Sequence, residues 1–485
     1  MKRKTINGMV WTVTERLSLQ AVHMLISIVL ARLLEPSEFG LVGMLAIFTS
    51  VAQSLLDSGF GSALIQKKNA TQTDATSIFY FNLFVGILLA GILSLAAPLI
   101  ADFYQQPTLI PLTRALSLSM VINAFGLVQL SLMNKNLEFK RHFSVSISAV
   151  ILSGVAGIVA ALSGLGVWSL VIQTLSHSLV RSILLWIFNK WRPTQHFSFS
   201  ALKSMYSFGS KLLVAGLIET TFKNIYQTFI GKEYSATDLG YYSRASTIEQ
   251  AATVATSMSL GRVIFPAFSP YQDDHKVLKQ VFRKTIRLSM FLHIPLMMGL
   301  IAVADPLFRF LLTDKWGDSI PYFQLLCVVG LLYPIQVQNY NLFRIKGRSD
   351  LHLKLEIVKY MITAIAIALT YKSGITALLL GQIATAVISN SLNSFFVGKL
   401  IDYRLFEQLR DLIPSFLVAL FMGFCVYLFG LLGIDSHLIM LILQITAAVV
   451  IYYLINKIIK SNELRELMAI ITDLWNEFSV KLKGV

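Results

Sequence analysis

The chain alternates between long apolar runs and short polar connections along its whole length. A bilayer core about 30 Å thick needs about 20 apolar residues in a helix, so each run predicts one membrane-spanning helix. Hydropathy and loop signals together predict fourteen spans. Their approximate limits are 6–33, 39–65, 76–103, 109–133, 142–162, 165–189, 205–231, 238–266, 283–304, 319–343, 351–371, 375–398, 410–432 and 437–459. The connections leave no room for a folded domain outside the membrane, so the sequence predicts an all-α polytopic membrane protein.

The composition agrees with this class and excludes an ordinary soluble protein. Of the 485 residues, 55% are hydrophobic and 14% are charged, whereas soluble proteins carry about 25% charged residues. The basic start Met1–Lys4 leads into a long apolar run without a small-residue cleavage site, so this run is expected to be the first span. Cys327 and Cys425 lie in apolar stretches, which favours a packing role over a disulfide or a metal site.

The net charge of +15 is divided unevenly between the two sets of connections. Most Lys and Arg residues lie in the set that includes both termini, in stretches such as "QKKNATQTD", "MNKNLEFKRH" and "YQDDHKVLKQVFRKTIR". The opposite connections hold only Lys232, Lys315 and Lys372, with Arg32 and Arg309 just inside the spans. The positive-inside rule therefore predicts cytoplasmic termini. This placement favours contact with anionic membrane lipids and excludes nucleic acid as a partner.

The C-terminal segment 462–485 differs from the spans. Between residues 462 and 483, apolar residues recur at helical spacing and charged residues occupy the other face. The pattern is typical of an amphipathic helix on the cytoplasmic membrane surface, and a partner-binding helix is the alternative.

Two corners of the chain carry the same motif 200 residues apart. Ser37-Glu38-Phe39-Gly40 and Thr237-Asp238-Leu239-Gly240 each follow an apolar run of about one span. Downstream, Ala97-Pro98-Leu99 recurs as Asp305-Pro306-Leu307, and "GLGVWSLVIQ" recurs as "SGITALLLGQ". Each copy holds six spans, an even number, so the two copies have the same membrane orientation. The sequence therefore predicts a parallel internal repeat, as in transporters with two rocking lobes.

The repeat divides the chain into four predicted parts. The N-lobe covers 1–197 and the C-lobe 198–403, each with six spans. A final pair of spans occupies 404–461, and the amphipathic segment occupies 462–485. Two similar bundles that face each other are expected to enclose a central cavity.

The stretch "LARLLEPSEFGLVGMLAIF…LLDSGFGSALIQKKNAT" resembles the N-terminal part of Wzx-type polysaccharide exporters, and "GVWSLVIQ", "YSFGSKL", "DLGYYSRA" and "TDKWG" resemble later parts. These exporters belong to the multidrug/oligosaccharidyl-lipid/polysaccharide (MOP) superfamily. The resemblance covers nearly the whole chain and is closest to the colanic-acid and teichuronic-acid exporter branch. It implies two six-helix lobes plus a helix pair in the bacterial inner membrane. It also implies flipping of an undecaprenyl-diphosphate-linked oligosaccharide to the outer leaflet, beside the polymerase and glycosyltransferases of one pathway.

The polar residues within the spans gather in the first two spans of each lobe. The first span carries one polar stripe, because a spacing of four, four, three and four keeps its members on one helix face: Thr12, Arg16, Gln20, His23 and Ser27. Charge inside a bilayer is costly, so such residues usually face a cavity or a partner. The candidate cargo-binding residues are Arg16, Lys211, Lys223, Arg244, Arg262, Gln20 and His23. Arginine forks and lysine ammonium groups suit a diphosphate. An internal ion pair or a snorkelling side chain is the alternative for each cation.

Three carboxylates in these spans are candidates for coupling transport to a proton or sodium gradient. They are Asp57, Glu219 and Glu249. Structural pairing is the alternative role, above all for Glu219, which lies four residues before Lys223. Asp273-Asp274-His275 lies in a basic loop, which argues against a metal site. The chain has no phosphate-cradling glycine motif, so no cofactor is expected.

Two other functions compete with the flippase. An ion-coupled exporter of small cationic compounds would favour an acidic cavity, whereas cations outnumber acids in the polar spans. A membrane polymerase or ligase of glycans would need an external loop that holds catalytic groups. The predicted external loops are too short for this, so the chain is not expected to be an enzyme.

The charge distribution predicts which loops face the cytoplasm. On a background without Cys327 and Cys425, a cysteine in place of Lys68 should be protected from an impermeant thiol reagent in intact cells. A cysteine in place of Lys315 should react, because its loop is predicted to be external. Labelling at position 68 but not at 315 would reverse the orientation.

Overall fold

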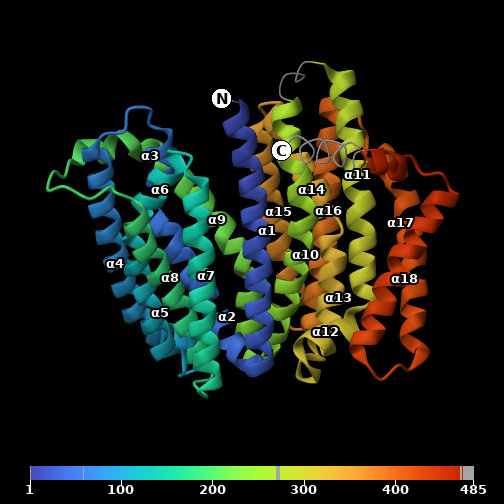
Figure 1. Ribbon diagram of the computed structural model, residues 1–485, viewed down its shortest axis with the longest axis horizontal. Coiled ribbons are helices and arrows are strands. Elements are labelled where there is room, and N and C mark those ends of the chain that lie inside the picture. Colours follow the sequence, from blue (N-terminus) through green and yellow to red (C-terminus); the bar gives the residue numbers. More distant parts are fainter. Residues whose placement is uncertain (1, 58, 269–273, 470–471, 473–485) are drawn as a thin grey trace, which may run out of the picture. The chain divides into compact units, whose positions relative to one another are not determined.

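The computed structural model describes residues 2–57, 59–268, 274–469 and 472, and within the helices it leaves undescribed the side chains of 2–17, 207–208, 211–212, 255 and 257–268. Every regular element in this part of the chain is helical. The helices form two compact units, residues 1–243 and 244–485, which are coloured blue to green and green to red in Figure 1. The lobe boundary predicted at residue 198 comes from the sequence repeat and not from the packing of the helices. It stays a prediction.

The N-terminal unit is a bundle of long helices joined by short connections. Its elements are α1 (Lys2–Leu33), α2 (Pro36–Asp57), α3 (Phe60–Gln66), α4 (Gln72–Tyr104), α5 (Leu109–Ala124), α6 (Leu127–Lys135), α7 (Phe139–Leu162), α8 (Trp168–Phe188), α9 (Phe199–Glu233) and the start of α10 (Ala236–Phe268). Helices α7 and α8 pack closely, as do α4 and α5, α2 and α9, and α1 and α7. Gly59, with φ of 70°, allows the bend between α2 and α3.

The C-terminal unit contains the rest of α10 and the helices that follow it. These are α11 (His275–Ala302), α12 (Ala304–Leu312), η2 (Asp314–Trp316), α13 (Ser319–Gly330), α14 (Tyr333–Ile345), α15 (Ser349–Thr370), α16 (Ile375–Ile401), α17 (Leu405–Phe429), η3 (Gly430–Leu432) and α18 (His437–Ile458). Helix α11 packs along α17, and α17 along α18.

A helix or a pair of consecutive helices covers each of the fourteen predicted spans, so the all-α class is confirmed. By length and composition, nine helices of the described residues qualify as membrane spans, and the α5–α6 pair, bent by 43°, makes ten. Helices α1, α9, α10 and α15 are not among them. Of α1, only Ser18–Leu33 lies in the part whose side chains are described, an apolar stretch too short to qualify, and α9 and α10 also contain side chains outside that part. The number of spans therefore stays a prediction.

The bundle carries apolar side chains outward and many polar side chains inward. Leu95 and Leu99 of α4 are 83% and 71% exposed, and Phe406 of α17 is 81% exposed. In contrast, many Ser, Thr and Asn residues are buried. Ser119, for example, donates to the Leu116 carbonyl of its own helix at 2.6 Å. An apolar exterior around a partly polar interior is typical of a helical membrane protein.

The two repeated corners meet in the N-terminal unit. A Cβ atom added to Gly40 of α2 would lie 1.6 Å from the Ala236 carbonyl oxygen, and one added to Gly240 of α10 would lie 1.9 Å from the Pro36 carbonyl oxygen. The first turns of α2 and α10 therefore touch backbone to backbone, each through the glycine of its own motif. This reciprocal contact explains why the chain contains the same corner twice.

The acidic residue of each motif accepts hydrogen bonds within its own corner. Glu38 accepts a hydrogen bond from the Glu35 backbone N–H at 2.8 Å. Asp238 accepts from the backbone N–H and the hydroxyl of Ser235, at 3.2 and 2.6 Å. Both carboxylates lie in the first turn of a helix, where they satisfy free N–H groups and complement the helix dipole.

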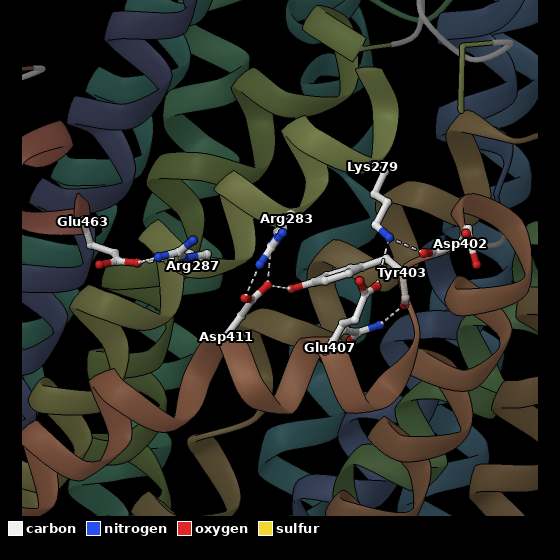
Figure 2. A network of polar contacts seen from close by, with 9 residues as sticks. Lys279, Arg283, Arg287, Asp402, Tyr403, Glu407, Asp411 and Glu463 are labelled. Atoms are coloured by element: carbon white, nitrogen blue, oxygen red, sulfur yellow. Dashed lines mark hydrogen bonds and ion pairs between the residues drawn. The ribbon is translucent and has the colours of Figure 1, made fainter. Parts of the chain in front are cut away.

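Ionic contacts join α11 to α17 in the C-terminal unit, as Figure 2 shows. Arg283 forms a bidentate pair with Asp411 at 2.5 and 2.6 Å, and Lys279 pairs with Glu407 at 2.9 Å. Tyr403 is wholly buried and donates to Asp411 at 2.7 Å. Burial, followed by this hydrogen bond, raises the pKa of Tyr403, so the phenol stays a donor. The basic residues that the sequence predicts on the cytoplasmic side thus also hold two helices together.

Basic residues of α11 also form ion pairs with the start of the C-terminal segment. Residues 462–469 are helical, Arg287 pairs with Glu463, and Lys284 lies 3.3 Å from Glu466. Most of the remaining predicted amphipathic helix lies outside the described residues, and its membrane-surface position stays a prediction.

The backbone contact between the corners predicts a specific sensitivity. Replacing Gly40 or Gly240 with Ala should destabilise the protein by about 1–3 kcal/mol or more, because a backbone neighbour cannot move aside as a side chain can. Thermal unfolding of the purified protein in detergent measures this effect. Gly91→Ala is the matched control, since a Cβ there meets nothing within 4 Å. Equal stability of all three variants would rule out the contact.

Candidate binding cavity

A cavity of about 550 Å³ lies within the N-terminal unit, between α1, α2, α5, α7, α8 and α9. Apart from one methionine, every side chain that lines it can form hydrogen bonds, and no carboxylate is among them. The lining residues are His23, Thr49, Ser50, Gln53, Ser119, Met120, Asn123, Ser153, Gln173, Thr174, His177, Ser178, Thr220, Lys223 and Asn224. A cavity lined by hydrogen-bonding side chains, called the chamber below, therefore lies among helices with apolar exteriors.

Helical spacing explains how these polar residues come to face one chamber. On α8, Gln173 and His177 are four residues apart, and on α9 Thr220, Lys223 and Asn224 are three and four apart. Such spacings place side chains on one face of a helix. Each of these helices therefore presents a polar stripe to the cavity.

Hydrogen bonds fix the walls of the cavity. Asn123 of α5 donates to Gln53 of α2 at 3.0 Å, and Gln53 donates to Asp57 at 3.0 Å. The hydroxyls of Ser54 on α2 and Thr220 on α9 are 2.9 Å apart. These contacts hold three helices in register around the chamber without neutralising its cation.

Lys223 supplies the cavity with a positive charge. Among the side chains that the structure describes, it has no hydrogen-bond or ion-pair partner, including Glu219 four residues earlier. Two imidazoles lie on the same lining, with the ring centroids of His23 and His177 6.4 Å apart. The chamber thus combines a free ammonium group with neutral hydrogen-bonding groups, which suits an anionic, hydroxyl-rich ligand.

The structure places the candidate residues of the first and seventh spans in different ways. His23 and Lys223 line the cavity, whereas Gln20 does not. Arg16 and Lys211 lie in the described helices α1 and α9, but their side chains are outside the described part, and their roles stay predictions.

The remaining candidates lie elsewhere. Asp57 is bonded to Gln53 behind the lining, and Glu219 is exposed on α9. In the other unit, Glu249 is buried and bonded to Thr253, and Arg244 is half-buried on α10. The side chain of Arg262 is outside the described residues.

The loop cluster Asp273-Asp274-His275 is described only from Asp274 onward. There, Asp274 caps α11 by accepting from the backbone N–H groups of Lys276 and Val277, both at 3.0 Å. Within the described residues, no group of three or more His, Cys, Asp or Glu side chains is placed to hold a metal ion.

Sequence reasoning missed the contribution of α8. Gln173, His177 and Arg181 are spaced four residues apart within an apolar span. Gln173 and His177 line the cavity, and Arg181 lies near enough to Asp57 and His177 to interact with them electrostatically. The helical spacing of polar residues that marks the stripe on the first span is also present in this sixth span.

Comparison with known proteins places the chain among bacterial polysaccharide proteins. A family model described as "Polysaccharide biosynthesis protein" matches residues 29–321. The lipopolysaccharide biosynthesis protein WzxC of Escherichia coli is 28% identical over 82% of this chain and 81% of its own length. The teichuronic acid biosynthesis protein TuaB of Bacillus subtilis is 26% identical over 87% of this chain and 88% of its own.

Solved structures show the same fold. The lipid II flippase MurJ, in an inward closed conformation, has a TM-score of 0.77 at 16% identity, over 96% of this chain and 100% of its own. An inward-facing MATE-family multidrug transporter of the MOP superfamily has a TM-score of 0.60 at 16% identity, over 79% of this chain and 95% of its own. The predicted MOP fold is therefore confirmed.

Proposed function

This chain belongs to the polysaccharide biosynthesis protein family, and from this premise we propose that it flips a lipid-linked oligosaccharide across the bacterial inner membrane. The cargo is an undecaprenyl-diphosphate-linked repeat unit that moves from the cytoplasmic to the outer leaflet. The observation that carries the proposal is the polar cavity of the N-terminal unit, with its free cation, inside an apolar helical bundle.

The chemistry of the cavity suits this cargo. Hydroxyl and amide side chains such as Ser50, Asn123 and Gln173 both donate to and accept from sugar hydroxyls. The Lys223 ammonium attracts a phosphate oxygen, and His23 and His177 add two further polar groups. The uncharged lining residues can bond to different sugars, whereas the Lys223 ammonium favours a ligand that carries a negatively charged phosphate.

The same lining argues against the competing functions. A cavity for small organic cations needs negative charge, but none of the fifteen lining residues is a carboxylate. The similarity to the multidrug transporter extends to the fold alone. The relatives are proteins of polysaccharide biosynthesis, among them the succinoglycan biosynthesis transport protein ExoT of Rhizobium meliloti, 25% identical over 67% of this chain. Transport rather than glycan polymerisation is the function we propose for this family member.

The remaining parts of the proposal rest on the sequence. Both termini are cytoplasmic, the two lobes rock around the cargo, and a proton or sodium gradient drives the cycle. Arg16, Lys211, Arg244 and Arg262, with Gln20, add to the cargo contacts in other steps of this cycle. Glycosyltransferases of the same pathway supply the cargo, and the polymerase of that pathway consumes it.

Replacing Lys223 with Ala tests the cavity. Removal of a charge-assisted bond worth about 1.5–3 kcal/mol should weaken cargo binding about tenfold or more. Surface polysaccharide in a flippase-deficient strain should fall accordingly, with the variant at normal membrane levels. Lys223→Arg should keep part of the activity, because the positive charge remains.

Lys372→Ala is the matched control, since it removes an equal charge that is not part of the cavity lining. It should complement the strain fully. Full complementation by Lys223→Ala as well would contradict the cargo role of the cavity.

A further inference from the structure

Glu249 of α10 is a buried carboxylate without a cation. Two carboxylates, Asp74 and Glu249, are buried in the part of the chain that the structure describes. Asp74 pairs with Lys67 at 2.9 Å and accepts from the Thr71 backbone N–H at 2.9 Å. No Lys, Arg or His among the described side chains lies within ion-pair distance of Glu249. Burial of an unpaired negative charge is strongly unfavourable, so this site favours a carboxyl group that carries a proton.

The position of the carboxyl group is fixed from two sides. The Thr253 hydroxyl donates to Glu249 Oε1 at 2.6 Å. On the other helix, a Cβ atom added to Gly330 at the end of α13 would lie 2.2 Å from the same oxygen. The carboxyl group therefore packs directly against the Gly330 backbone, in a space that only glycine leaves open.

A buried histidine contacts the same glycine. His293 of α11 is fully buried, and its Nε2 lies 2.9 Å from the Gly330 carbonyl oxygen. A carbonyl oxygen can only accept, so Nε2 carries a hydrogen and donates. Nδ1 lies 2.7 Å from the Thr256 hydroxyl. That hydroxyl is also 3.1 Å from the Thr253 carbonyl oxygen.

The Thr256 hydroxyl allows His293 two protonation states. When Nδ1 is bare, the hydroxyl donates to it. When Nδ1 carries a proton, it donates to the hydroxyl oxygen, and the hydroxyl donates to the Thr253 carbonyl. The imidazole can thus gain or lose a proton without leaving a hydrogen-bonding group unsatisfied.

Other titratable groups around the pair do not neutralise it. The buried thiol of Cys327 on α13 faces Glu249 and is uncharged at neutral pH. On α11, the cations Lys279, Arg283 and Arg287 lie at least six residues before His293, and carboxylates of α17 and the C-terminal segment hold them. On α14 and α16, which also pack against α11, no charged group of the described residues interacts with His293.

We propose that Glu249 and His293 form a proton-binding site in the C-terminal unit, and that this site, if the proposed transport function holds, couples flipping to a proton gradient. The site holds one proton in either of two states. In one state the proton forms an N–H bond at His293 Nδ1 and Glu249 is a carboxylate; in the other the N–H bond is broken, an O–H bond is formed at Glu249, and both groups are neutral. Release of that proton to water leaves a carboxylate and a neutral imidazole.

Infrared difference spectroscopy tests proton binding directly. The full chain is purified into nanodiscs of phosphatidylethanolamine and phosphatidylglycerol, and spectra are compared across pH. The wild type should show a protonated-carboxyl C=O band that titrates, and Glu249→Gln should remove this band. Asp435→Asn, which changes an exposed carboxylate of the same unit, should leave it unchanged. Thr253→Val, which keeps the carboxyl group but removes its hydrogen bond, should shift the band even if Glu249→Gln fails to fold.

The outcomes separate this site from the proposed function. An unchanged band in both Glu249→Gln and Thr253→Val overturns the site. A wild-type band that responds to sodium at constant pH overturns the proton assignment. In proteoliposomes, Glu249→Gln should lose the stimulation of flipping by a pH gradient, and retained stimulation overturns the coupling role. If the wild type flips no cargo while the band still titrates and vanishes in Glu249→Gln, the proton site stands and the proposed function fails.

Discussion

The backbone contact between α2 and α10 is the constraint on which the N-terminal unit depends. Gly40 and Gly240 are the points at which two helix starts touch with no side chain between them. This contact sets where α2 and α9 run, because α2 takes part in it and α9 ends one corner before α10. The cavity lies between these helices and their neighbours. A small-residue crossing allows close approach in a membrane, where lipid chains compete with apolar side chains for contact.

The second constraint is that polar groups inside the bundle must either form hydrogen bonds or serve a function. Many of the hydroxyls and amides inside the bundle bond within their own helix or to another helix, as Ser119 and Asn123 do. Lys223 and Glu249 have no partner of opposite charge among the described side chains. Keeping an unpaired charge or acid in a membrane protein is costly, so a function that requires it is the simplest explanation. Lys223 lies in a cavity suited to an anionic cargo, and Glu249 lies in a buried site suited to a proton.

The sequence predicts the helices better than it predicts how they meet. Hydropathy is a local property, so every predicted span corresponds to helix in the structure. The repeat of Gly40 at Gly240 was visible, but their mutual contact was not, because the approach of two backbones leaves no periodic signal. His23 and Lys223 were identified from intramembrane polarity, whereas His177 of α8 was overlooked. Gly330 could not be identified from the sequence, because only the fold places its backbone against both Glu249 and His293. The side chains of Arg16 and Lys211 lie outside the described part, and their roles stay predictions.

Reconstituted flipping tests the central claim most directly. The purified chain is placed in liposomes that carry a fluorescent undecaprenyl-diphosphate oligosaccharide, and an impermeant reducing agent quenches the label in the outer leaflet. Protein-free liposomes should retain the protected half of the signal, whereas liposomes with the chain should lose most of it as cargo exchanges between leaflets. Retention of the protected half by liposomes that contain correctly folded chain would contradict the account.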